Sequence, residues 1–205
     1  MPGNGAMHEE IALQAQASFA AWPQNWRAQV LTAPPLIAPA RQFVYPVQIA
    51  GEEDALARGA LQLLVHPATG GTFLATCALG FKSASVPTAL FACPNADQFC
   101  ALAGGYAYVV NAAQPEQCTH LAMKPVVDVR VSAQHKLLLF VGFHNMMAWG
   151  RDGLAWETAR LSWEGIQVEA VERDRITGFG WNLQTDREVE FAVDLNTGKH
   201  TGGGF

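Results

Sequence analysis

The residues whose types and spacing are best suited to chemistry lie between positions 144 and 164, where three of the six tryptophans stand among polar and charged side chains. Aromatic rings supply contact area and a few polar groups fix the orientation of a ligand, so this mixture is typical of a ligand pocket or a partner face. The side chains that we expect to form the face are His144, Asn145, Trp149, Asp152, Trp156, Glu157 and Arg160. The alternative is simple packing, because tryptophan is also common in β cores.

The central pair expected in this face is Trp156 with Arg160. If residues 158–163 continue a strand, alternation places Trp156 and Arg160 on one side of it and Trp163 on the other side, together with Leu161. The first side is the more polar of the two. We therefore expect Trp156 and Arg160 to be exposed next to each other, within range of a cation–π contact.

Catalysis in the same segment would need an acid or a base within reach of a bound substrate. Asp152 and Glu157 are five residues apart across a glycine turn, and a tight turn would place them on either side of a site that also holds His144. A hydrolase with a carboxylate and histidine site near residues 144–160 is therefore the alternative to a binding function. No GxSxG, HExxH or GxxxxGK[ST] motif occurs, and Ser132, like the other serines, has no distinctive neighbours in the sequence.

Neither a metal nor a cofactor is expected. The six histidines include no pair at a ligand-like spacing. The four cysteines are Cys77, Cys93, Cys100 and Cys118, and they contain no CxxC pair and match no common zinc spacing. We expect all four to be free thiols that pack as small apolar residues. A disulfide between Cys93 and Cys100 is the alternative if the protein is exported.

The elements that must position these residues begin with a helical segment. Residues 9–22 are rich in helix formers, and Pro23 ends the helix that they predict. Further prolines make residues 31–40 an extended connector. We therefore expect a helical segment and a proline-rich connector over residues 1–41, followed by a single β domain over residues 42–205.

Strands are predicted along the rest of the chain. The clearest covers residues 188–195, in which large apolar and acidic side chains alternate. The side chains expected in the core are Val189, Phe191, Val193 and Leu195, with Glu188 and Glu190 exposed. Residues 137–143 are apolar throughout, which is typical of a central strand. A Glu164-Gly165 turn predicts a hairpin within residues 158–171.

Short strands and turns at this spacing predict an all-β, mainly antiparallel protein, either a propeller-like array of twisted sheets or a β-sandwich. Residues 104–111 and 136–143 each form an apolar strand followed by a polar turn and another strand, and each resembles a strand of a propeller-type β repeat. That resemblance implies about four blades of ~40–45 residues each. The whole chain is also similar to bacterial proteins of unknown function, a likeness that implies no residue roles.

Composition defines the class of protein. Hydrophobic residues make up 50% of the chain and charged residues 15%, which is enough apolar material for a sizeable core. The net charge is −5 and the chain lacks the clustered basic residues of a nucleic-acid binder. It also lacks a membrane-spanning stretch and a basic leader, so we expect a soluble cytoplasmic protein. The function expected is a non-catalytic binding or protein-interaction module whose partner is a protein or a small molecule.

Overall fold

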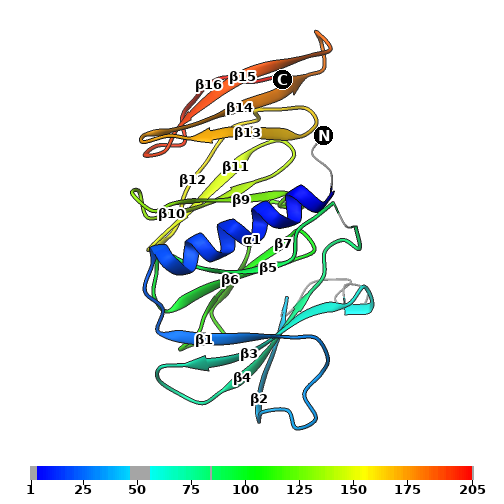
Figure 1. The fold of residues 1–205 in the computed structure, drawn as a ribbon, viewed down its shortest axis with the longest axis vertical. Helices are drawn as coiled ribbons and strands as arrows, with labels where there is room; N and C mark the ends of the chain where they lie inside the picture. The colour runs from blue at the N-terminus through cyan, green and yellow to red at the C-terminus, as the bar shows by residue number, and fades with distance from the viewer. Residues whose placement is uncertain (1–3, 47–55, 84, 205) are drawn as a thin grey trace. The chain divides into compact units, whose positions relative to one another are not determined.

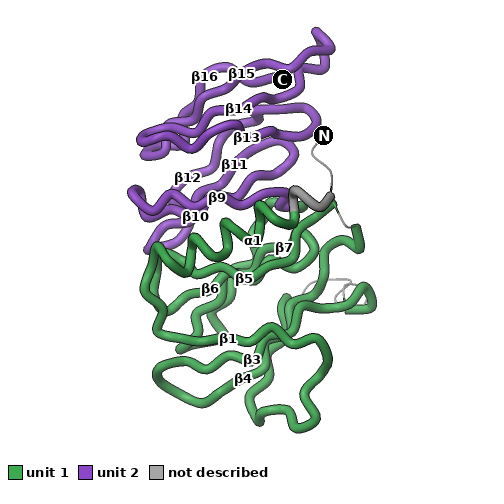
Figure 2. The backbone as a smooth tube through the Cα atoms, in the orientation of Figure 1, with its two compact units in different colours: residues 1–125 green, residues 126–205 purple. Residues whose placement is uncertain are grey.

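The computed structural model describes residues 4–46, 56–83 and 85–204. As predicted, these residues are mostly antiparallel β with an N-terminal helix (Figure 1), and the strands among them form four four-stranded sheets. It divides into two compact units, residues 1–125 and residues 126–205 (Figure 2). Each unit is described by itself. The expectation of a single β domain over residues 42–205 stays a prediction.

The first unit opens with helix α1 (Asn4–Ala21), which ends two residues before Pro23 as the sequence predicts. The helix lies against the second sheet of this unit. Ser18 on α1 is fully buried, and its hydroxyl oxygen accepts a hydrogen bond from the backbone N–H of Ala92 at 3.0 Å. A small polar side chain therefore joins the helix to the strand beneath it.

The first sheet has the strand order β1-β3-β4-β2. Its strands are β1 (Trp26–Leu31), β2 (Arg41–Tyr45), β3 (Ala60–Pro67) and β4 (Phe73–Ala78). Strand β2 runs parallel to β4, whereas the other pairs of this sheet are antiparallel. No strand was predicted at β1. Trp26 anchors it, because its ring lies 5.4 Å from that of Phe99 and its indole N–H donates to the carbonyl of Gln98 at 3.1 Å.

The second sheet of the first unit and both sheets of the second unit are simple antiparallel meanders. The first of them holds β5 (Ala89–Ala92), β6 (Gln98–Ala103), β7 (Tyr106–Asn111) and β8 (Cys118–His120). The next holds β9 (Asp128–Ser132), β10 (Leu137–Val141), β11 (Met146–Gly150) and β12 (Gly153–Glu157). The last holds β13 (Ile166–Val171), β14 (Arg175–Asn182), β15 (Arg187–Asp194) and β16 (His200–Gly202). A meander thus begins about every 40 residues, which is the length of a propeller blade.

The core of the second unit lies between its two sheets. Strand β10 is buried at every position, as expected of a central strand. On β15 the predicted alternation is confirmed, because Phe191 and Val193 are buried whereas Glu188 and Glu190 are exposed. Leu195 is also buried and Val189 is half-buried. Period-two patterning therefore identified both the strand and its inner face.

The hairpin predicted within residues 158–171 is wrong. Residues 158–165 form no strand, and β13 pairs with β14 instead. The segment lies flat against β14, where Gly180 allows its close approach. A Cβ atom at Gly180 would stand 2.2 Å from the carbonyl oxygen of Leu161. Leu161 is fully buried there, and that oxygen accepts a hydrogen bond from the backbone N–H of Gly204 at 2.8 Å.

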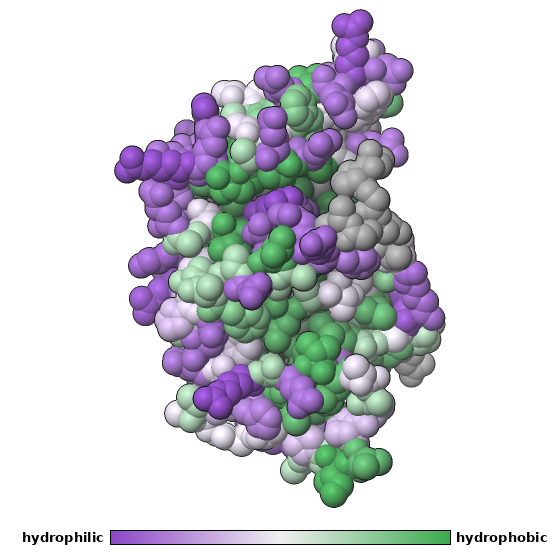
Figure 3. Space-filling view, viewed as in Figure 1, coloured by the Kyte–Doolittle hydropathy of each residue, from purple (hydrophilic) through white to green (hydrophobic). Residues whose placement is uncertain are grey.

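Polar and apolar side chains are interspersed over the side of the molecule drawn in Figure 3. Within the described residues, no helix combines the length and the apolar character that crossing a bilayer requires.

Candidate recognition face

Trp149 and Trp156 lie in the interior, so the predicted exposure of Trp156 is wrong. Trp156 is only 8% exposed and belongs to the core between the two sheets of the second unit. Its indole N–H donates to the carbonyl of Leu195 at 2.8 Å. Gly198, with a φ of +70°, packs against the indole ring of Trp156. A Cβ atom at position 198 would lie 2.8 Å from the nearest atom of that ring. Trp149 on β11 is buried as well.

The exposure of Trp156 was predicted wrongly because the strand stops earlier than the sequence suggests. Strand β12 ends at Glu157, so alternation does not continue to Arg160. Residues 158–165 then leave the sheet, and Arg160 and Trp163 both become exposed. The guanidinium carbon of Arg160 lies 4.5 Å from the ring centroid of Trp163. The cation–π contact expected of Arg160 is therefore present, with a different tryptophan.

Four exposed side chains lie on the β10–β11 loop and on the segment after β12, two stretches that are hydrogen-bonded to each other through His144. They are Phe143, His144, Arg160 and Trp163, and we call them the Trp163 face. Phe143 is 44% exposed and Trp163 is 40% exposed. Sequence reasoning missed both aromatic residues, since it placed Phe143 in a strand and Trp163 in the core. The polar Glu164-Gly165 turn that follows Trp163 was the only signal that could have placed it at a loop end.

Backbone hydrogen bonds hold the two halves of the face together. The carbonyl of His144 accepts from the backbone N–H groups of Leu161 at 2.7 Å and Ser162 at 3.3 Å. The Nδ1 atom of His144 lies 3.2 Å from the carbonyl oxygen of Ser162. A carbonyl can only accept, so Nδ1 carries a proton in this contact. The face is therefore a pre-arranged surface rather than two independent loops.

The Trp163 end of the face is fixed to β14. The backbone N–H of Trp163 donates to the carbonyl of Trp181 at 3.0 Å. In return, the backbone N–H of Trp181 donates to the hydroxyl oxygen of Ser162 at 2.8 Å, and that hydroxyl in turn donates to the carbonyl of Gly165. Because these bonds restrain the backbone on both sides of Trp163, ordering the loop costs little conformational entropy when a partner binds.

The carboxylates proposed for a hydrolase are not brought together. Asp152 lies in the β11–β12 turn, whereas Glu157 is the last residue of β12. At about 3.3 Å per strand residue, the backbones of Gly153 and Glu157 are separated by about 13 Å. Glu157 instead accepts a hydrogen bond from the side-chain amide of Asn145. Asn145 and Glu157 therefore border the Trp163 face, and Asp152 lies at the far end of the strand.

The thiols of the first unit are free, in agreement with the prediction, and three of the four are fully buried. Burial raises the pKa of Cys77, Cys93 and Cys100 far above the ordinary value. Burial also raises the pKa of the half-buried Cys118 to about 12. A thiol that stays protonated is a poor nucleophile and a poor metal ligand. These cysteines are therefore structural.

His120 is the most perturbed histidine of the first unit. Its ring is half-buried and lies 5.0 Å from the ring of Tyr106 and 4.5 Å from that of Tyr108. Burial, and then the positive charge of Lys124, lower the pKa of His120 to about 4. The imidazole is therefore neutral at physiological pH and packs as an aromatic ring. Among the residues that the structure describes, no three metal-ligating side chains are grouped closely enough to hold an ion.

No protein-family model matches the sequence, and no curated protein shows significant similarity to it.

Proposed function

We propose that this protein is a binding module that recognises a partner protein through the Trp163 face, and that this face is non-catalytic. The observation that carries the proposal is the exposure of two large aromatic side chains beside a stacked arginine on hydrogen-bonded loops. Leaving a large apolar side chain in water forgoes roughly 1.5–3 kcal/mol of burial. Trp and Arg are also the residue types that dominate the energetics of protein interfaces.

The face has the chemistry to bind a carboxylate beside an apolar side chain. The guanidinium carbon of Arg160 lies over the indole of Trp163, and a guanidinium in a cation–π contact still has N–H groups that can make a bidentate contact with a carboxylate. None of the ion pairs found among the described residues involves Arg160. Phe143 supplies the neighbouring apolar surface. We therefore expect the partner to present an acidic residue next to an aliphatic or aromatic one.

The test is whether a surface variant that folds normally loses the ability to bind the partner. The wild-type chain is used to capture and identify a partner, whose dissociation constant is then measured with purified components. The double variant Arg160→Ala, Trp163→Ala should weaken that binding at least 100-fold, because two hot-spot truncations of about 1.5–2 kcal/mol each are removed. Its melting temperature should stay within a few degrees of the wild type.

The matched control removes exposed apolar surface elsewhere. Leu36 and Ile37, in the loop after β1, are almost fully exposed. The double variant Leu36→Ala, Ile37→Ala should bind the same partner as tightly as the wild type. If this control loses the partner and the Arg160, Trp163 variant keeps it, the proposed face is not the recognition surface.

A further inference from the structure

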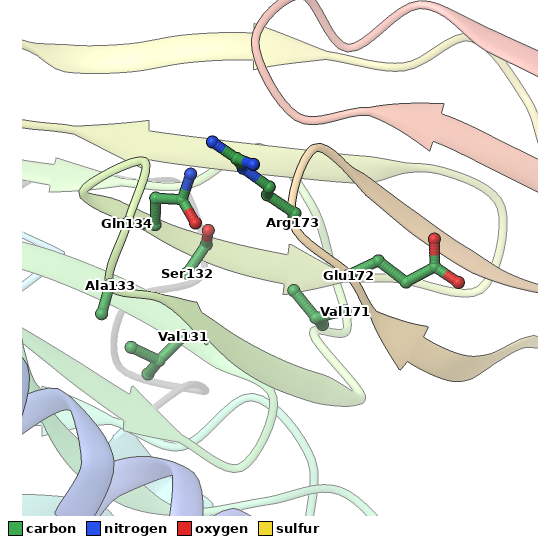
Figure 4. A pocket seen from close by; sticks show the side chains of 7 residues that line it. All are labelled: Val131, Ser132, Ala133, Gln134, Val171, Glu172 and Arg173. Atoms are coloured by element: carbon green, nitrogen blue, oxygen red, sulfur yellow. The ribbon is translucent and has the colours of Figure 1, made fainter.

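A pocket of about 280 Å³ lies in the second unit, between the β9–β10 turn and the β13–β14 turn. It is lined by residues 131–134 and 171–173 (Figure 4). In Figure 4 the hydroxyl of Ser132, the amide of Gln134 and the guanidinium of Arg173 lie on one side, and the carboxylate of Glu172 points away from them. That carboxylate is paired with the Nε of Arg175 at 2.5 Å. The polar lining of the pocket thus combines a guanidinium, which only donates hydrogen bonds, with a hydroxyl and an amide, which can both donate and accept them.

Ser132 contacts a histidine, and that histidine is near an aspartate. The hydroxyl oxygen of Ser132 is 3.1 Å from Nδ1 of His135, and Nε2 of His135 is 3.6 Å from a carboxylate oxygen of Asp174. A carboxylate favours the tautomer that carries its proton on Nε2, which leaves the Nδ1 lone pair to accept the hydroxyl proton of Ser132. A hydroxyl, an imidazole within hydrogen-bond distance of it and a carboxylate within ion-pair distance of the imidazole therefore follow one another beside a pocket.

We propose that Ser132 is a nucleophile for acyl transfer, with His135 as its general base, and that the pocket accepts small esters bearing a carboxylate. This site is separate from the Trp163 face, and neither depends on the other. In the first step the Ser132 oxygen bonds to the ester carbonyl carbon while its proton passes to Nδ1 of His135. The alcohol then leaves with that proton. Water, deprotonated by the same nitrogen, releases the acid and restores the hydroxyl.

The walls of the pocket define the class of substrate. Its volume of about 280 Å³ is just below the usual range for ligand sites, so it suits a short acyl chain rather than a large one. Val131 and Val171 supply apolar walls for that chain. Arg173 and Gln134 donate hydrogen bonds, and we assign Arg173 to the carboxylate of the substrate and Gln134 to the oxyanion that forms on attack. Asp174 is a positioning residue, because it acts through His135.

The direct test is covalent labelling of the intact chain by a small alkyl fluorophosphonate. The serine oxygen bonds to phosphorus, fluoride leaves, and the hydroxyl proton passes to the base, so no other reagent is needed. Mass spectrometry of the whole protein and of its peptides should place one adduct on Ser132. Ser132→Ala should abolish that adduct, and His135→Gln should slow its formation about 100-fold or more, the usual contribution of a general base.

A second histidine–hydroxyl pair provides the matched control. Nδ1 of His66 lies 2.9 Å from the hydroxyl of Thr72 at an exposed site in the first unit. His66→Gln should leave the labelling of Ser132 unchanged, and Thr72 should carry no adduct. Asp174→Asn should slow labelling and Asp174→Glu should restore part of the rate, a recovery that a purely structural role of the turn does not predict.

Hydrolysis of p-nitrophenyl esters tests the substrate class. The wild type should hydrolyse an ester whose acyl chain ends in a carboxylate faster than the neutral ester of equal length. Arg173→Ala should reduce the ratio of these two rates at least tenfold. Absence of an adduct on Ser132 in the folded wild type would overturn the proposal, as would equal labelling in His135→Gln. If Ser132→Ala or His135→Gln fails to fold, the proposal is decided by whether the adduct on the wild-type protein is located on Ser132. Partner binding at the Trp163 face is measured separately and is unaffected by either result.

Discussion

Replacement of Trp156 is the sharpest test of the second unit, because the sequence and the structure lead to opposite expectations for it. Trp156 is 8% exposed, packs in the core with Leu161 and Phe191, and donates its indole N–H to the Leu195 carbonyl at 2.8 Å. Trp163, seven residues later, is 40% exposed and stacks with Arg160. Truncating the two tryptophans should therefore have very different effects on the free energy of unfolding.

The magnitudes follow from what each side chain contacts. Trp156→Ala removes a buried ring and leaves a cavity, which costs about 3–5 kcal/mol. Trp156→Phe keeps most of the apolar contact but leaves the buried Leu195 carbonyl without its donor, which costs about 1–3 kcal/mol. Trp163→Ala loses an exposed cation–π contact, which contributes about 0.5–1 kcal/mol. The expected order of destabilisation is Trp156→Ala, then Trp156→Phe, then Trp163→Ala.

Urea titration followed by far-ultraviolet circular dichroism measures these differences without depending on tryptophan fluorescence. All three variants lie in the same unit, so they report on the same transition. Equal slopes with different midpoints would show that only stability has changed. If Trp156→Ala costs less than about 1 kcal/mol, or less than Trp163→Ala, then Trp156 is not in the core and the assignment of the Trp163 face must be abandoned.

Three other perturbations have defined outcomes. Because burial and Lys124 lower the pKa of His120 from 6.5 to about 4, its stabilising contribution is complete above pH 6.5 and lost as the pH falls towards 4. The ring is only half-buried, so the loss in free energy of unfolding should be about 1–3 kcal/mol. Urea titrations at pH 7 and 4.5 should show a smaller difference in stability for His120→Phe than for the wild type. An equal difference in the two proteins would refute the lowered pKa of His120. Phe191→Ala should lower the free energy of unfolding by about 3–5 kcal/mol, whereas Glu190→Ala should leave it almost unchanged. If urea titration gives the reverse order, the register of β15 is wrong. Gly180→Ala should cost more than about 2 kcal/mol, because its Cβ would meet the Leu161 carbonyl at 2.2 Å, and an unchanged melting temperature would show that residues 158–165 pack elsewhere.

Local patterns in the sequence were sufficient for some of the strands and for part of the core. The inner face of β15 follows from period two alone, since Phe191 and Val193 alternate with acidic residues over one strand. The burial of β10 follows from its continuous apolar run. Pro23 determined where α1 stops, because the residue before a proline avoids helical geometry. Each of these features depends on residues that are neighbours in the chain.

Contacts between distant residues decided what local patterns could not. The end of β12 depends on Gly180, which lets residues 158–165 lie against β14 instead of continuing the sheet. The core between the two sheets of the second unit buries Trp156, and the path of residues 158–165 outside the sheet leaves Trp163 exposed. Ser132 and His135 are three residues apart and had no distinctive pattern in the sequence, whereas Asp174 and residues 171–173, which complete the pocket, come from another sheet. Sequence alone therefore determined the all-β class and the inner faces of β10 and β15, whereas β1, the end of β12 and both candidate sites were decided by tertiary packing, because they depend on contacts between segments that the chain order does not place together.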